Sequence, residues 1–193
     1  MTNKHVHVLK TETLSDDWYV LKKTTFEYQR KNGTSQTLTR ETYDRGNGAT
    51  ILLYDLTRGT VVLTRQFRYP TFINGNADGF LIECAAGLLD NAQPAERIKQ
   101  EVEEETGFHL KNVKPVFESF MSPGSVTERL FFFVASYQAS DRLSEGGGNF
   151  NEGEDIEVLE LRFTEAMSMV HSGAICDGKT IMLLQYAALN IFN

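Results

Sequence analysis

Alternating apolar and polar positions predict β-strands in the first part of the chain. Residues 20–30 and 36–43 are rich in Thr, Phe and Tyr, which favour strands. They flank Asn32-Gly33, a dipeptide typical of a tight hairpin turn because both residues tolerate positive φ. The sequence therefore predicts an antiparallel β segment near the N-terminus.

Three later runs predict a central sheet. Residues 49–54 and 61–67 are short and rich in β-branched side chains, and a turn joins them. Residues 129–137 form an almost uninterrupted apolar run, which is typical of a strand buried on both faces.

Helical periodicity is clearest at residues 94–106. Apolar positions recur there on one stripe, Pro94 suits the first position of a helix, and Gly107 suits the position just after the last. Further helices are expected at residues 164–171 and 179–191, and the second is apolar almost all round, which indicates burial. Strands and helices mixed in this order predict an α+β protein built in layers.

Composition narrows the class of protein. The chain has 193 residues, of which 41% are hydrophobic, enough for one domain with a real core or one domain with an appendage. Its formal net charge of −7 disfavours binding to nucleic acid or to an anionic membrane surface. The sequence shows neither a long apolar run nor the apolar core of a signal peptide, so we expect a cytoplasmic protein.

The two cysteines suggest neither a disulfide framework nor a zinc site. Cys84 and Cys176 lie far apart and form no CxxC pair, so we expect both to be buried apolar thiols. The run of Phe131, Phe132 and Phe133 is likewise interpreted as core rather than as a platform for stacking bases.

Acidic side chains concentrate in the predicted helix. Glu101, Glu104 and Glu105 stand at i, i+3 and i+4 and converge on one face, whereas Glu103 points elsewhere. Like charges at these spacings cost about 0.2–0.5 kcal/mol per pair, and carboxylates at a helix C-terminus oppose its dipole by about 0.3–1 kcal/mol each. Two interpretations remain: a solvated acidic face, or a site for a hard cation such as Mg²⁺ or Mn²⁺.

The segment from Gly87 to Phe108 resembles the Nudix box, whose pattern is G-x5-E-x7-R-E-U-x-E-E-x-G-U with U a bulky apolar residue. The second half matches at Glu101, Val102, Glu104, Glu105, Gly107 and Phe108. Two departures stand in the first half. The interval between the two glycines is one residue shorter, and Gln93 and Gln100 replace the expected Glu and Arg. In the family these two residues brace the loop on the helix, so we expect a hydrogen bond between the two glutamines instead.

The resemblance covers nearly the whole chain and lies in the nucleotide-sugar and ADP-ribose branch of the Nudix family. The matching stretches are YDRGNGATILLY (43–54), RQFR (65–68), GLLDN (87–91), MSPG with VTE (121–128), EDIEVLEL (154–161) and DGKT (177–180). The resemblance implies a Nudix α/β/α sandwich with a mixed central sheet over residues 46–193. It also implies an N-terminal antiparallel β segment, residues 1–45, that contributes to a homodimer.

The resemblance further implies a catalytic set and a metal site. The catalytic residues are Glu101, Glu104, Glu105 and Glu154. The ligands of Mg²⁺, with Mn²⁺ as an alternative, are the carbonyl of Ala86 and the carboxylates of Glu101, Glu105 and Glu154.

A loop carboxylate would deprotonate the attacking water. Glu154 is the first candidate because it follows the glycine-rich stretch at residues 140–155, which we expect to be a mobile loop. Glu152, Asp155 and Glu157 are close competitors, and any of them could instead be an ordinary solvated acid.

Substrate contacts are implied at positions in several parts of the chain: Trp18, Thr39, Arg40, Glu41, Arg68, Ala86, Gly87, Leu88, Glu105, Glu128, Gly153, Glu154 and Lys179. The planar guanidinium of arginine suits a phosphate, and an aromatic ring suits a base. Taken singly, Arg40, Arg68 and Lys179 are more typical of solvated surface cations, and Trp18 is at least as typical of a core or an interface.

The implied function is Mg²⁺-dependent hydrolysis of the pyrophosphate bond of a nucleotide sugar, with GDP-mannose giving GMP and mannose 1-phosphate. Hydrolysis of ADP-ribose on the same scaffold is one alternative. A module that binds a nucleotide sugar without cleaving it is another, and the intact set of Glu101, Glu104 and Glu105 disfavours it.

Overall fold

The computed structural model describes residues 5–193, which divide into two compact units. One unit comprises Met1–Asn47 with Phe120–Arg129, and the other comprises Gly48–Ser119 with Leu130–Asn193. The segment 120–129 belongs with the N-terminal strands although it is far from them in sequence. Tyr43 forms a parallel bridge with Val126, and its N–H donates to the Ser125 carbonyl over 2.7 Å.

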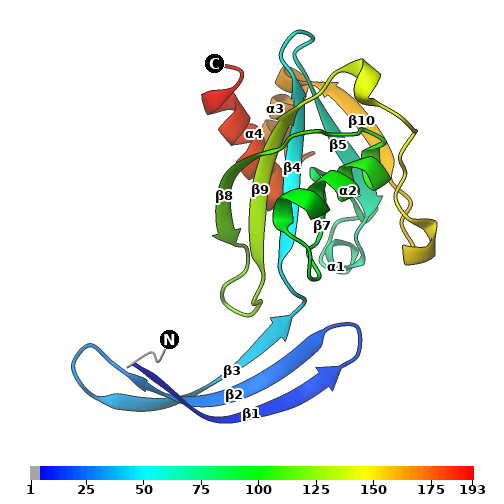
Figure 1. The fold of residues 1–193 in the computed structure, drawn as a ribbon. Helices are drawn as coiled ribbons and strands as arrows, with labels where there is room; N and C mark the ends of the chain where they lie inside the picture. Colours follow the sequence, from blue (N-terminus) through cyan, green and yellow to red (C-terminus); the bar gives the residue numbers. More distant parts are fainter. Residues whose placement is uncertain (1–4) are drawn as a thin grey trace. The chain divides into compact units, whose positions relative to one another are not determined.

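The N-terminal unit is an antiparallel sheet of three strands in the order β1-β2-β3 (Figure 1). The strands are β1 (Val6–Asp16), β2 (Val20–Gln29) and β3 (Ser35–Asp44). The hairpin predicted at Asn32-Gly33 is confirmed, with Gly33 at φ +84°. β1 was not predicted, because nearly all of its residues are exposed and so carry no regular apolar pattern.

The second unit is built on a mixed sheet of seven strands. Its central order is β10-β5-β4-β9-β8, with β6 paired to β5 and β7 paired to β4. The bounds are β4 (Gly48–Asp55), β5 (Thr60–Phe67), β6 (Phe80–Glu83), β7 (Ala85–Leu88), β8 (Lys114–Phe120), β9 (Arg129–Ser136) and β10 (Glu157–Arg162). Strands β4 and β9 are parallel, so the mixed central sheet expected from the sequence is confirmed.

Helices cover both faces of this sheet. They are α1 (Tyr69–Phe72), α2 (Pro94–Thr106), α3 (Phe163–Ser172) and α4 (Gly178–Asn190), with short 3₁₀ turns at Ala139–Asp141 and Phe150–Glu152. Figure 1 shows α2 in front of the sheet and α3 and α4 behind it, which is the layered α/β/α arrangement. Helix α4 was expected to be buried, and this holds for the face that carries Leu183, Leu184 and Ala187, whereas Leu189 is exposed.

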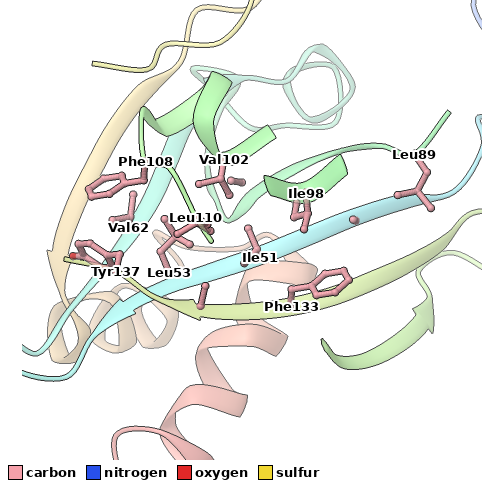
Figure 2. Close-up of a cluster of buried hydrophobic side chains, with 13 residues drawn as sticks. Ile51, Leu53, Val62, Leu89, Ile98, Val102, Phe108, Leu110, Phe133 and Tyr137 are labelled. Carbon is pink, nitrogen blue, oxygen red and sulfur yellow. The ribbon is translucent and has the colours of Figure 1, made fainter. Parts of the chain in front are cut away.

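The core under α2 fixes the rotation of that helix (Figure 2). Ile98 and Val102 are fully buried and point at the sheet, toward Ile51 on β4. Burying two such side chains contributes roughly 1.5–3 kcal/mol each, so the face that α2 presents to the sheet is strongly specified. Phe108 closes the cluster edge-to-face on Tyr137, with ring centroids 4.9 Å apart.

The expectation of buried thiols holds for one cysteine only. Cys84 is buried, and burial raises the pKa of its thiol to about 12. Cys176 is exposed, because it lies in the connection before α4 rather than in a strand. Phe132 and Phe133 are buried, as expected for core residues. None of the helices described is long and apolar enough to cross a membrane.

Candidate active site

A tight passage from strand β7 into helix α2 holds the first carboxylate of the site. Helix α2 starts at Pro94 and ends at Gly107, which takes the left-handed conformation at φ +76° and lets the chain turn back. The side chain of Glu101 lies directly against the backbone of Gly87, where an added Cβ would overlap the Glu101 carboxyl group. A side chain at position 87 would therefore force the Glu101 carboxyl group or the backbone to move.

Arg97 braces this passage. Its Nε donates to the Leu88 carbonyl over 3.1 Å, and its guanidinium forms an ion pair with Glu101 one turn further along α2. The expected hydrogen bond between Gln93 and Gln100 is absent among the described residues, so that interpretation is wrong. The bracing cation stands one helical turn before the position of the missing box arginine, at a spacing that also reaches Glu101.

Glu105 is the most deeply buried carboxylate of the helix, with 1% of its surface exposed. Its Oε2 accepts a hydrogen bond from the Ala86 N–H over 3.3 Å. Burial raises the pKa of Glu105 well above its ordinary value, and the nearby charges of Glu101 and Glu154 raise it further, while Arg68 acts in the opposite direction. The structure thus gathers three carboxylates around one buried position.

Glu104 lies apart from this group. Its side chain is exposed and borders an open hollow together with Gln100, Glu103, Ser144 and Gly146. The three glutamates expected on one helix face therefore differ in burial. Glu101 and Glu105 are buried, whereas Glu104 is exposed.

The glycine-rich loop is docked onto the end of α2. The N–H groups of Gly147 and Gly148 donate to the carbonyls of Glu105 and Glu104 over 2.9 and 3.0 Å. These bonds satisfy carbonyls that the helix end would otherwise leave unpaired. The loop expected to be mobile is therefore joined to the helix by backbone hydrogen bonds. Its N–H groups also offset part of the unfavourable interaction between the helix dipole and the carboxylates at this helix end.

The same loop places Glu154. Its Oε2 accepts from the Asn149 N–H over 2.8 Å, and a Cβ at Gly148 would overlap its carboxyl group. Of the competing acids, Glu157 pairs with Arg65 over 3.3 Å and Asp155 is exposed. The side chain of Glu152 lies outside the described residues. Gly153, at φ +76°, ends the short 3₁₀ turn just before Glu154.

A second charged cluster brings the predicted contact residues Arg68 and Lys179 together around Glu83, a residue at the end of β6 that was not singled out from the sequence. Glu83 is 3% exposed. Its Oε2 accepts from Arg68 Nε over 2.7 Å, and its Oε1 pairs with Lys179 Nζ. Lys179 also pairs with Asp177 over 3.0 Å, and Asp177 caps α4 by accepting from the Thr180 N–H.

The two cations of this cluster are held in the charged state. Burial opposes the charge on Lys179, but Glu83 and Asp177 together raise its pKa above the ordinary value. Burial opposes the charge on Arg68 as well, but Glu83, Glu105 and Asp177 together raise its pKa above the ordinary value. One sequence signal could have indicated this cluster: Glu83 ends the apolar run FLIE. An acid at the end of such a run is expected to be buried, and a buried acid needs charged or hydrogen-bonding partners.

The remaining predicted contact residues lie in the N-terminal unit. Trp18 is 80% exposed in the turn between β1 and β2, so its interpretation as a core residue is wrong. Arg40 donates to the Thr39 carbonyl over 2.8 Å on β3, and Glu128 pairs with Arg45 over 3.6 Å. Glu41 lies next to Arg40 on the same strand and is exposed.

The solved structure of a protein titled an ADP compounds hydrolase has the same fold. It matches with a TM-score of 0.74 at 15% identity, covering 100% of both chains. At this identity the likeness concerns the fold alone, a layered arrangement in which a carboxylate-bearing helix covers a mixed sheet. Residues 5–43 match the family described as the GDP-mannose pyrophosphatase NudK N-terminal domain.

Three relatives match nearly the full chain, and each is a GDP-mannose pyrophosphatase. The protein of Pectobacterium atrosepticum is 54% identical over 184 residues, or 95% of this chain and 94% of the relative. The proteins of Yersinia enterocolitica and Salmonella typhimurium are each 53% identical and cover 94% of both chains. The chain therefore belongs to the GDP-mannose pyrophosphatase family of Nudix hydrolases.

Nudix hydrolases use a divalent metal ion, and the donors present fit one. Carboxylate oxygens are the ligands that hard divalent cations prefer. Burial first, and then the negative charges of Glu101 and Glu154, raise the pKa of Glu105, and Arg68 offsets this only in part. In the described part of the chain, however, no three Asp, Glu, His or Cys side chains form a ready-made metal site. Glu101 is turned to Arg97 and Glu154 to the backbone of Asn149, and these contacts would be exchanged for metal contacts.

Proposed function

We propose that the protein hydrolyses the pyrophosphate bond of GDP-mannose and releases GMP and mannose 1-phosphate. The observation that carries the proposal is the buried carboxylate of Glu105, which accepts from the Ala86 N–H and feels the charges of both Glu101, packed on Gly87, and Glu154. The names of relatives more than 50% identical over nearly the whole chain support GDP-mannose as the substrate.

We propose Mg²⁺ as the metal, with Mn²⁺ able to replace it. The carboxylates of Glu101, Glu105 and Glu154 would hold it together with the carbonyl of Ala86. When bound, the metal would neutralise phosphate charge and lower the pKa of a coordinated water. Glu104, exposed beside the cluster, would add negative charge that favours cations at the same place.

The protein's own cations would receive the diphosphate. The charge of Arg68 acts on Glu105, and Glu83 links Arg68 to Lys179. A guanidinium can donate two parallel hydrogen bonds to a phosphate, and an ammonium supplies a point charge. The backbone at Gly87 and Leu88 would contact the substrate at the end of β7, next to the carboxyl group of Glu101.

Proton transfer would fall to Glu154, with Gly153 allowing the turn that precedes it. Among the described acids of its loop, Glu154 is the one whose charge acts on Glu105. A carboxylate within reach of the attacking water would accept its proton as the new P–O bond forms, while the P–O bond to the bridging oxygen breaks and that oxygen leaves on the departing phosphate.

The N-terminal unit would supply the remaining contacts through Trp18, Thr39, Arg40 and Glu41, with Glu128 on the segment that joins it. We propose that this unit also forms a homodimer. No residue of its three described strands is buried, and Val8, Leu9 and Leu14 expose 47–56% of their surface. Apolar side chains on a sheet of one layer are stabilised when a second layer covers them.

We also propose a cytoplasmic location. Cys84 and Cys176 are both free thiols, which suits a reducing compartment.

The experiment that tests the function compares kcat/KM for GDP-mannose and ADP-ribose, at limiting enzyme and with Mg²⁺ present. We expect GDP-mannose to be preferred by at least about tenfold, with GMP and mannose 1-phosphate as products. Preference for ADP-ribose would overturn the assigned substrate. Release of no phosphorylated product from either compound would indicate a binding module instead.

A further inference from the structure

We propose that Glu83 is a positioning residue that holds Arg68 and Lys179 in place for the phosphates of the substrate. The inference rests on the proposed function, since the two cations act only if a phosphate-bearing substrate binds beside the carboxylate cluster. Glu83 itself would not contact the substrate.

The geometry shows one buried carboxylate divided between two cations. Glu83 Oε2 accepts a hydrogen bond from Arg68 Nε, and Glu83 Oε1 accepts one from Lys179 Nζ, so both carboxylate oxygens have a cationic partner. The three residues come from separate elements: the start of α1, the end of β6 and the first turn of α4. Glu83 is therefore the point at which two distant segments of the chain are tied together.

The contact with Glu83 leaves Arg68 able to bind an anion. Arg68 contacts Glu83 through Nε, and its two Nη atoms donate no hydrogen bond to any residue that the structure describes. The side chain remains 39% exposed. A guanidinium fixed through Nε presents its outer edge in one orientation, which is what two-point binding of a phosphate requires.

Holding long cationic side chains in advance lowers the cost of binding. Arg and Lys side chains have many rotamers, and part of this conformational entropy is lost when a ligand immobilises them. In this structure Glu83, together with Asp177 on Lys179, has already restricted both side chains.

The charge balance of the cluster allows two possible roles of Glu83 to be distinguished by experiment: positioning the cations, or only tuning how strongly the cluster attracts an anion. Arg68 and Lys179 carry two positive charges, and Glu83 and Asp177 carry two negative ones, so the group is balanced. If the cluster served only to attract an anion, replacing Glu83 with a neutral residue would strengthen substrate binding. If Glu83 positions the cations, the same change weakens binding, so the sign of the effect decides.

The test measures KM and kcat for GDP-mannose in the full-length protein and three variants. Glu83→Gln removes the charge, and Glu83→Asp keeps it but shortens the reach to the cations. The control Asp78→Asn removes one negative charge from an exposed pair with Arg65 just before β6. We expect KM to rise about tenfold in both Glu83 variants, with kcat changed less than about threefold, and the control to match wild type.

A KM that falls or stays unchanged in Glu83→Gln would overturn the proposal, as would a Glu83→Asp variant that behaves like Asp78→Asn. If Glu83→Gln does not fold, Glu83→Asp decides alone, because it keeps the buried charge balance. A lower melting temperature of the Glu83 variants with an unchanged KM would mean that Glu83 only stabilises the fold.

A second readout does not depend on catalysis. Amine-reactive labelling of the substrate-free protein, followed by peptide mapping, reports how firmly Lys179 is held. We expect at least about threefold faster labelling of Lys179 in Glu83→Gln than in wild type, and no change in Asp78→Asn. Equal labelling would show that Glu83 does not hold Lys179. If wild type cleaves no nucleotide sugar but the labelling differs as expected, the proposed function fails while the hold of Glu83 on Lys179 stands.

Discussion

The carboxyl group of Glu101 occupies the space that a side chain at Gly87 would need. This contact joins the two ends of the motif, because Gly87 lies on β7 and Glu101 lies two turns into α2. The glycine is thus a condition for the position of a carboxylate rather than only for the shape of a turn.

Gly87→Ala should displace Glu101 and lower kcat. The added methyl group overlaps the carboxyl group, so either the side chain or the turn must move. A misplacement of about 1 Å at a catalytic group can reduce the rate by roughly 10²-fold, which steady-state kinetics would detect. Gly124→Ala is the matched control, since an added Cβ there meets nothing within 4 Å. Equal rates for the two variants would contradict the role given to Gly87.

Arg97→Met should destabilise the protein by about 1–3 kcal/mol, because it removes a charged hydrogen-bond donor from the Leu88 carbonyl and leaves the largely buried Glu101 without that cation. Urea unfolding measures the change. Lys99→Met removes a cation paired with the exposed Glu96 and should cost at most about 1 kcal/mol. The account of the brace fails if both substitutions have the same effect.

Glu105→Gln should make the metal-free protein more stable at pH 8. Because the folded-state pKa of Glu105 lies above its ordinary value, the folded state binds this proton more tightly than the unfolded state. The free energy of unfolding of wild type therefore falls as pH rises through that raised pKa, and the Gln variant lacks this loss. Chemical unfolding with a chelator at pH 5 and pH 8 measures the difference.

The matched control for this stability prediction is Glu104→Gln, which changes an exposed carboxylate on the same helix. It should leave the pH dependence unchanged. A Glu105→Gln variant less stable than wild type at pH 8 would show that the repulsion among the carboxylates has been misread.

Thiol labelling of the native protein should modify Cys176 alone. Cys84 is buried with a thiol pKa of about 12, so it has almost no reactive thiolate at pH 8, whereas Cys176 is exposed. An Ellman assay should count one thiol in the folded protein and two in denaturant. The Cys176→Ser variant should give none until it unfolds, and rapid labelling of that variant would mean that β6 and β7 open readily.

Local signals predicted α2 well. Its start at Pro94, its end at Gly107 and its buried stripe follow from residue types within a few positions of one another. The Asn32-Gly33 hairpin was equally readable. Strand β1 could not be predicted in this way, because neither of its faces is buried and its sequence therefore shows no alternation of apolar and polar residues.

The parts of the site that could not be predicted depend on contacts between distant residues. Glu83 and Lys179 are 96 positions apart, so no spacing rule connects them. Arg97 took over a role expected of two glutamines because its reach to both Leu88 and Glu101 depends on how the turn packs. The docking of Gly147 and Gly148 on α2 is likewise a tertiary contact, whereas composition alone suggested a mobile loop.

The most direct test of the central claim is the rate of GDP-mannose hydrolysis by Glu105→Gln with Mg²⁺ present, with GMP and mannose 1-phosphate quantified by ³¹P NMR. The substitution keeps the shape of a buried side chain and removes the charge at the centre of the carboxylate cluster. The account predicts a loss of roughly 10³-fold or more in kcat in a folded protein. Hydrolysis at close to the wild-type rate would contradict it, because the cluster around Gly87 would then not be the catalytic centre.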